Sequence, residues 1–165
     1  MCSPGDVTAS EGPWTYDDES GTGEDLNLTR FSIAHDRVLR IPLIKQAMAL
    51  AARNGLPLRF FASPWAPPAW MTTQNTTIHN PTLKGGPTGK IAVAYARYLV
   101  KFFEAYAECG IPFWGLTAQN EPAGNTGAWQ DLKFTAEEQR DFIREVLGPA
   151  LHASDATRDI DLMIM

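Results

Sequence analysis

The sequence predicts an α/β fold in which parallel strands alternate with helices, and two observations support this. Segments with helical spacing of apolar residues alternate with short apolar runs, in the order helix, strand, helix, strand, helix, strand. This order is typical of parallel strands joined by right-handed crossovers. No glycine-rich dinucleotide turn follows an expected strand, whereas long aromatic loops do. Because closed barrels build their sites on such loops, we expect a fragment of a (β/α)8 TIM barrel rather than an open doubly wound sheet.

The chain divides by composition into two expected parts. Residues 1–36 are rich in Gly, Ser, Thr, Asp and Glu, and Trp14 and Tyr16 are the only large anchors before Leu26. Such a composition is typical of loops, so we expect 1–36 to form an irregular loop. Residues 37–165 then hold the expected partial barrel.

The first half of the barrel part contains one expected helix and one expected strand. Apolar residues recur at helical spacing over 42–53, Pro42 suits a first turn, and Asn54-Gly55 marks the end. The apolar run 58–62 lies between two prolines and predicts a strand buried on both faces. Segment 63–90 holds five prolines and a Gly-Gly pair, which excludes regular structure over its whole length.

The second half adds two helices and two strands. Residues 91–108 predict an amphipathic helix that ends near Gly110, and 113–118 predict the next strand. A capping-box pattern starts the third helix, 135–147, which we expect to stop at Gly148-Pro149. The last strand is expected at 160–165. Since a barrel needs about 250 residues, we expect only about three of its eight strands, in a truncated sequence.

Composition excludes several classes of function. The net charge is -5, the pI is near 5.1, and the basic residues are scattered, so no nucleic-acid partner is expected. No apolar stretch approaches the length of about 20 residues that crosses a bilayer. Two cysteines and three dispersed histidines have no metal-ligand spacing, so no metal and no cofactor are expected. Sequons at Asn27 and Asn75 permit N-glycosylation in a secretory pathway.

Glu121 is the strongest candidate for chemistry. It follows an apolar strand directly, stands between Asn120 and Pro122, and precedes a glycine-rich loop. Glycoside hydrolysis needs a carboxylic acid that protonates the leaving oxygen and, in retaining enzymes, a second carboxylate about 5 to 5.5 Å away. A glutamate held at a strand end suits the first of these roles.

Four blocks of sequence carry a resemblance to a known family. Residues 117–122 (TAQNEP) resemble the strand-4 signature of the large clan of (β/α)8 retaining glycosidases. Residues 62–70, 95–106 and 134–143 resemble glycoside hydrolase family 30, in the order in which that family carries them, and are most similar to its glucosylceramidase type. On this resemblance, the chain covers about strands 3 to 5 with their helices, and 1–36 is an insertion after a missing strand 2.

The resemblance implies roles for individual residues. Glu121 would be the acid/base, Asn120 would contact the sugar 2-hydroxyl, and Trp65 would pack in the glucose pocket, whereas Trp70 is expected to be structural. The family nucleophile lies on strand 7, so it is not in the chain, and the fragment alone is expected to be unstable and inactive. Asp155, Asp159 and Asp161 are not candidates, because they precede the last strand at the wrong end of a barrel.

The resemblance also implies a substrate and a location. The complete protein would hydrolyse the β-glucosyl bond of glucosylceramide to glucose and ceramide, with retention, as part of sphingolipid metabolism. It would be lysosomal or secreted, and would contact a membrane surface through its glycosphingolipid or other β-glucoside substrate. Two alternatives stay open: a family 30 endo-glucanase or xylanase, and a non-catalytic sugar- or lipid-binding module in which Glu121 only accepts a hydrogen bond.

Overall fold

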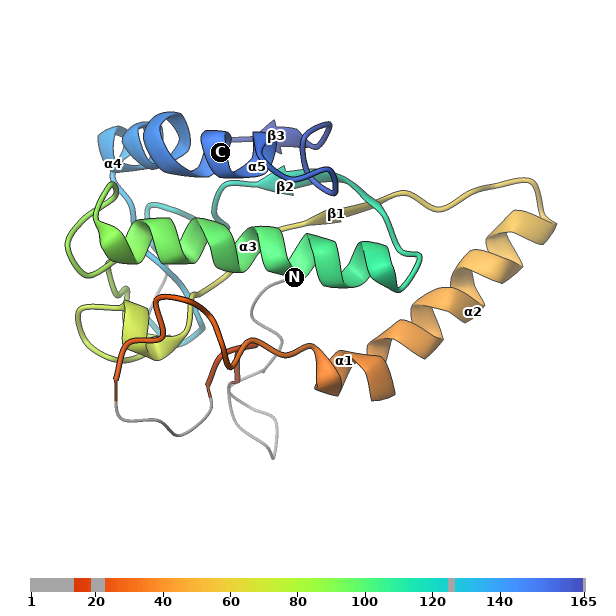
Figure 1. The fold of residues 1–165 in the computed structure, drawn as a ribbon, viewed down its shortest axis with the longest axis horizontal. Coiled ribbons are helices and arrows are strands. Elements are labelled where there is room, and N and C mark those ends of the chain that lie inside the picture. Colours follow the sequence, from red (N-terminus) through yellow and green to blue (C-terminus); the bar gives the residue numbers. More distant parts are fainter. Residues whose placement is uncertain (1–13, 19–22, 125–126, 165) are drawn as a thin grey trace.

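The chain forms a three-stranded parallel sheet with helices packed against it, which confirms the predicted α/β class (Figure 1). The computed structural model describes residues 14–18, 23–124 and 127–164. The strands are β1 (Phe60–Ala62), β2 (Phe113–Thr117) and β3 (Asp161–Met163), in the spatial order β1-β2-β3. Both strand pairs are parallel, as expected for neighbouring barrel strands joined by helices.

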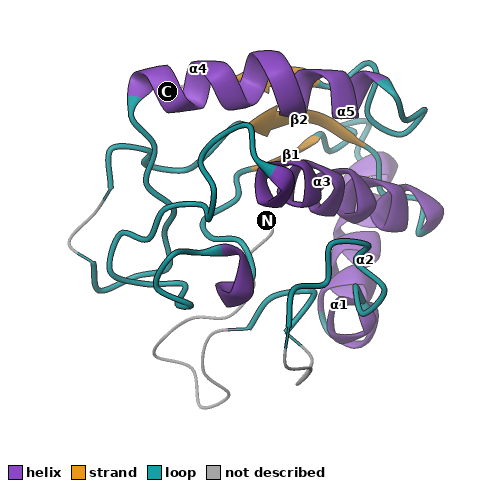
Figure 2. Ribbon diagram, turned by 60° about the vertical axis from the view of Figure 1, so that its left-hand side comes forward, coloured by secondary structure: helices purple, strands orange, loops and turns teal. Residues whose placement is uncertain are grey.

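One face of the sheet is covered by helices (Figures 1 and 2). The helix α3 (Lys90–Glu108) lies beside a continuous second helical segment, made of α4 (Ala136–Phe142), the π-helical turn η2 (Ile143–Leu147) and α5 (Gly148–His152). The predicted stop at Gly148-Pro149 is therefore wrong. Pro149 occupies the first turn of α5, where a missing backbone N–H is tolerated, so the chain continues in helical conformation.

The core is built mainly from the buried side of α3. Its spacing of aromatic residues places Phe102, Phe103 and Tyr106 around Phe113 of β2, with ring centroids 5.3 to 5.6 Å apart. All three α3 rings are at most 3% exposed. Burial of each such side chain contributes roughly 1.5 to 3 kcal/mol. Packing between α3 and β2 therefore holds the strand that leads to Glu121.

The opposite face of the sheet is partly exposed among the described residues. Phe60 packs toward the core, but Phe61 is 55% exposed, so the prediction of a strand buried on both faces is wrong for β1. Gly115 lies on the same face as Phe61, and a Cβ there would meet Met163 Cε at 3.0 Å. In the part of the chain that the structure describes, the helices cover one face (Figures 1 and 2), whereas a closed barrel places the other face in its interior.

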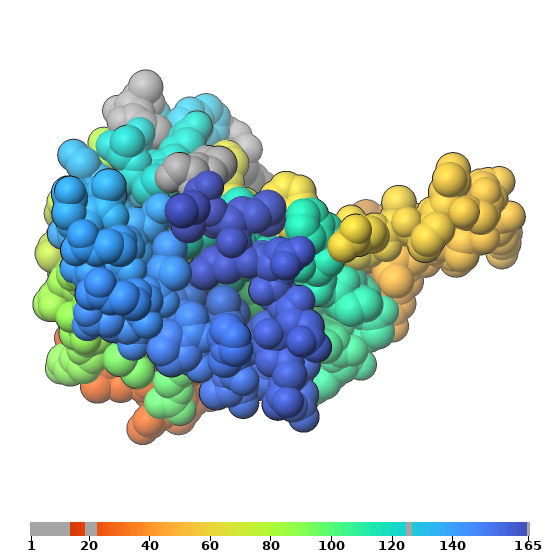
Figure 3. Space-filling model, turned by 90° about the horizontal axis from the view of Figure 1, so that it is seen from above, coloured from red at the N-terminus to blue at the C-terminus, as the bar shows by residue number. Residues whose placement is uncertain are grey.

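The N-terminal helices extend from this body. α1 (Ala34–Val38), which the sequence analysis did not predict, is followed by α2 (Arg40–Arg53), which starts two residues before the expected 42–53. Figure 3 shows the region of α2 projecting beyond the rest of the molecule. Leu43 and Leu50 on it are 65% and 62% exposed. Only part of the apolar spacing of α2 is used within the described residues, where Ile41 is buried and Ile44 and Met48 pack against the core.

A buried carboxylate fixes α1 to the core. Asp36, 1% exposed, accepts hydrogen bonds from Tyr16 Oη at 2.6 Å, Tyr106 Oη at 2.7 Å and Arg40 Nη1 at 2.8 Å. Burial, together with the hydrogen bond to Asp36, raises the pKa of Tyr106 well above its usual value. Charge-assisted hydrogen bonds of this kind are stronger than neutral ones. Asp36 therefore ties the N-terminal segment to the end of α3.

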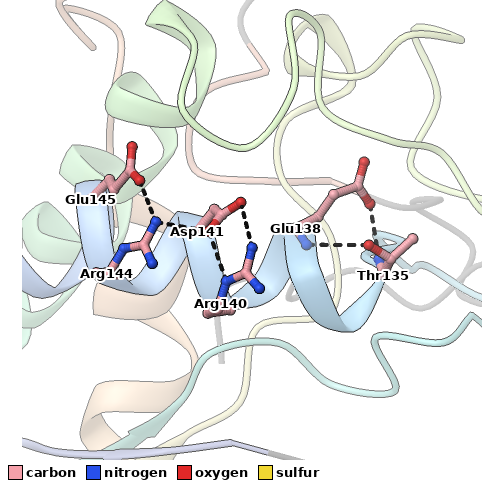
Figure 4. Close-up of polar contacts among 6 residues, drawn as sticks. All are labelled: Thr135, Glu138, Arg140, Asp141, Arg144 and Glu145. Atoms are coloured by element: carbon pink, nitrogen blue, oxygen red, sulfur yellow. Dashed lines mark hydrogen bonds and ion pairs between the residues drawn. The ribbon is translucent and has the colours of Figure 1, made fainter.

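The capping box that begins α4 is confirmed (Figure 4). Thr135 Oγ1 accepts from Glu138 N at 3.2 Å, and Glu138 Oε2 accepts from Thr135 N at 2.8 Å. We expect Thr135→Ala to lower the free energy of unfolding by about 1 kcal/mol, because it leaves the Glu138 backbone N–H without its side-chain acceptor. Urea unfolding checks this, with Thr135→Ser, which keeps the hydroxyl, as the control. Equal losses in both variants would contradict the capping role.

Exposed charges continue along the same helix. Arg140 and Arg144 both pair with Asp141, and Arg144 also pairs with Glu145 (Figure 4). The Asp141 carboxylate raises the pKa of Arg140, and Arg140 in turn lowers the pKa of Asp141. Since these side chains lie at the surface, solvent screens the pairs, and they contribute little to stability.

Candidate active site

The candidate site lies at the edge of the sheet where β1 and β2 both end. β1 ends at Ala62 and β2 ends at Thr117, four residues before Glu121. Because parallel strands place their carboxyl ends at one edge, the loops that begin at Ser63 and Ala118 start side by side. The site positions predicted from the sequence therefore share one edge of the sheet.

Three hydrogen bonds join these two loops. They link Ser63 Oγ with Thr117 Oγ1 at 2.6 Å, Asn120 N with Pro64 O at 3.0 Å, and Gln119 Nε2 with Trp65 O at 2.7 Å. Gln119 is fully buried, so its side chain acts as an internal brace between the loops. The structure thus places the backbone of Trp65 next to the turn that carries Asn120 and Glu121.

Glu121 is exposed and has an unusual backbone conformation. Its φ is +47°, in the left-handed region that residues other than glycine rarely adopt. Gly124 N donates to Glu121 O at 2.9 Å and closes the turn. A conformation of this kind costs roughly 1 to 3 kcal/mol and persists where the surroundings impose it, often at functional sites. The turn directs the residue after a buried strand outward to solvent.

The loop that carries Glu121 is braced on the long loop after β1. A bridge pairs Ile78 with Gln130, and three further backbone hydrogen bonds connect the segments, from Asp131 N to Thr77 O, from Lys133 N to Pro81 O and from His79 N to Gly127 O. Gly124 approaches Asn80 so closely that a Cβ would lie 2.5 Å from Asn80 Oδ1. Both loops therefore form one connected rim around the strand ends.

Two tryptophans on this rim are open to solvent. Trp65 is 39% exposed, and Trp129 is 44% exposed. Aromatic rings at a sugar site offer an apolar face for packing. Trp129 was missed in the sequence analysis, although a lone tryptophan in a glycine-rich loop after the Glu121 strand was a usable signal. Trp70, by contrast, is partly buried, and its indole N–H donates to Asp17.

Other polar residues stay away from this rim. Asp155 and Asp159 precede β3 and Asp161 begins it, so all three lie toward the opposite end of the strand from the rim. Within the described part of the chain, no three His, Cys, Asp or Glu side chains gather as metal ligands. Among the same residues, no helix is long and apolar enough to cross a membrane.

Comparison with known proteins identifies the family. The model of the glycosyl hydrolase family 30 TIM-barrel domain matches residues 6–165. The chain belongs to glycosyl hydrolase family 30. Its membership makes the Glu121 rim the candidate site of a glycosyl hydrolase, and makes the three-stranded sheet a part of a TIM barrel.

Individual relatives of this family 30 chain include different enzymes. The lysosomal acid glucosylceramidase of Mus musculus is 42% identical over 156 residues, which cover 92% of this chain and 29% of the mouse protein. The crystal structure of SrfJ from Salmonella typhimurium matches with a TM-score of 0.77 at 28% identity, over 93% of this chain and 32% of that one. An endo-β-1,6-glucanase structure matches with a TM-score of 0.71 at 26% identity, over 92% and 31% of the two chains.

Proposed function

We propose that this chain supplies the acid/base part of a retaining β-glucosidase that hydrolyses glucosylceramide to glucose and ceramide. The observation that carries the proposal is the position of Glu121 in an outward-facing turn at the ends of β1 and β2. In TIM-barrel enzymes, residues at this edge perform the chemistry. The similarity to the mouse lysosomal glucosylceramidase supports this choice of substrate and a lysosomal or secreted location.

The proposed mechanism uses Glu121 twice. In the first step Glu121 donates its proton to the ceramide oxygen, while a carboxylate from another part of the complete protein attacks the sugar and forms a glycosyl-enzyme intermediate. In the second step Glu121 takes a proton from water, which releases glucose with its original β configuration. No residue of this chain takes the nucleophile's role. Asn120 would contact the sugar 2-hydroxyl, and Trp65 would pack on the glucose ring.

A second function within the family also has support. The endo-β-1,6-glucanase structure matches this chain at 26% identity. The alternative is therefore cleavage within a polysaccharide, with Glu121 as the same acid/base. Endo-xylanase activity would use the same acid/base. In each case the bond broken is glycosidic, and the groups on the two sides of that bond differ.

A substrate comparison with the complete barrel protein tests the proposal. The protein is incubated separately with glucosylceramide in detergent micelles, with a β-1,6-glucan and with xylan, and the products are identified by mass spectrometry. We expect glucose and ceramide, and we expect proton NMR to show β-glucose as the first-formed anomer. Oligosaccharide products would favour the endo-acting alternative. Binding of sugar without turnover of any substrate would overturn the enzyme proposal.

A further inference from the structure

Trp70 connects the rim to a part of the chain far away in sequence. It lies in the 3-10 turn η1 (Ala69–Met71), five residues after Trp65. Its Nε1–H donates to Asp17 Oδ2 at 3.1 Å and lies 3.3 Å from Asp17 O. These two residues are separated by 53 positions. The contact is therefore a tertiary tie between the segment before α1 and the loop that carries Trp65.

Asp17 is an unusual acceptor for this tie, because it is buried. The residue is 1% exposed, and its second oxygen, Oδ1, is buried without a hydrogen-bond partner in the described structure. The charged groups that act on it are Asp25, Asp18 and Arg30, and Arg30 lies 3.8 Å from Asp25. A buried carboxylate that lacks full hydrogen bonding costs free energy. The surroundings of Asp17 are therefore unfavourable for a charged carboxylate.

The segment between Trp65 and Trp70 is stiff enough to transmit this constraint. Ala66, Pro67 and Pro68 are buried, and the two prolines fix their φ angles. At its end, Trp70 O accepts from Lys84 Nζ at 2.7 Å. At its start, the Pro64 and Trp65 carbonyls hold the turn before Glu121. A shift of Trp70 is thus passed to the position of Trp65.

We propose that Asp17 is a positioning residue of the glycosidase site, because its carboxyl group holds the Trp70 indole and thereby fixes the loop that presents Trp65 next to Glu121. The role of Trp65 in binding the sugar rests on the function proposed above. The tie between Asp17 and Trp70, and its response to protons, does not.

Protonation removes the unfavourable burial of a charge at Asp17. Burial, followed by repulsion from Asp25, raises the pKa of Asp17 from the usual 3.8 to about 6, although the Trp70 hydrogen bond and Arg30 oppose the rise. Between these two pH values the folded protein holds a proton that the unfolded chain releases. By linkage, the folded state gains stability as the pH falls through about 6, and the gain is complete below about 3.8. The folded state is therefore most stable in an acidic medium, where the neutral Asp17 carboxyl still accepts from the Trp70 indole, although less strongly than a carboxylate would.

The stability test uses the complete barrel protein and the isosteric variant Asp17→Asn, which keeps an acceptor but cannot ionise. We expect the melting temperature of wild type minus that of Asp17→Asn to rise by about 1 to 3 °C between pH 7 and pH 5. Asp159→Asn, a matched change at an exposed site, should leave that difference near zero. If the wild type and Asp17→Asn respond equally to pH, proton control by Asp17 is overturned, whatever the enzyme's activity.

The positioning test uses steady-state kinetics with a β-glucoside. Asp17→Ala and Trp70→Phe each break the tie, and each should raise KM about tenfold with kcat changed less than threefold, as expected for loss of uniform binding. Asp17→Asn should recover most of the affinity at pH 5. If both tie-breaking variants keep the wild-type KM, the positioning role is overturned. If Asp17→Ala does not fold, Trp70→Phe and Asp17→Asn decide the same question.

Discussion

Glu121→Gln in the complete barrel protein is expected to lower kcat/KM for glucosylceramide by about a thousandfold. The glutamine amide occupies the same turn but cannot deliver a proton to the departing ceramide oxygen. A glucoside with an activated aryl leaving group needs little protonation, so its first step should be slowed much less. Steady-state kinetics should therefore show a much larger loss of kcat/KM for glucosylceramide than for the activated aryl glucoside.

A matched substitution separates this chemistry from a general effect of charge. Glu137→Gln changes an exposed glutamate in the first turn of α4 and should leave both substrates within about twofold of wild type, since a surface charge has little effect at a distance. If Glu121→Gln lowers kcat/KM by the same factor for both substrates, Glu121 is not the proton donor. Such a result would leave the family membership intact and would redirect the search for the acid.

The largest effect on stability is expected from Asp36→Ala. This change removes the acceptor of three hydrogen bonds, which come from two tyrosine hydroxyls and the Arg40 guanidinium. Loss of one partner from a buried charged pair costs about 3 to 5 kcal/mol. Urea unfolding followed by tryptophan fluorescence should show a loss of free energy of unfolding in this range.

Two controls bound the Asp36 result. Tyr106→Phe removes one hydroxyl and should cost about 1 kcal/mol. Glu108→Ala removes the partner of Arg37 at 3.9 Å, where both side chains are more than half exposed, and should cost less than about 1 kcal/mol. An Asp36→Ala variant no less stable than Glu108→Ala would show that the buried network adds nothing beyond a surface pair.

Local patterns explain why much of the fold was predictable. The spacing of apolar residues in α3 and the Gly110 stop depend only on neighbours in sequence, and the structure follows both closely. Likewise, the capping box of α4 is complete within four residues, 135–138. The end of the third helix was predicted wrongly because Gly148-Pro149 suits either a stop or a first turn, and the helix that continues here buries Leu151 in the core.

The candidate site was predictable only in part. The position of Glu121 after a strand follows from the sequence, but its left-handed conformation depends on the closure of its turn by Gly124. Asp17 and Asp36 could not be found, because their partners are up to 53 and 70 positions away, and such contacts leave no periodic trace in the sequence. The predicted burial of Phe61 was wrong, because the sequence of a strand does not tell which other segments cover each face of the sheet.

The left-handed turn at Glu121 has a consequence for stability. Glycine adopts a φ of +47° without a steric penalty, so a glycine at this position would relax the backbone and make the fold more robust. The same change would silence the proposed reaction, because it removes the carboxyl group. A relaxed backbone and the proposed proton transfer are therefore set against each other at a single position.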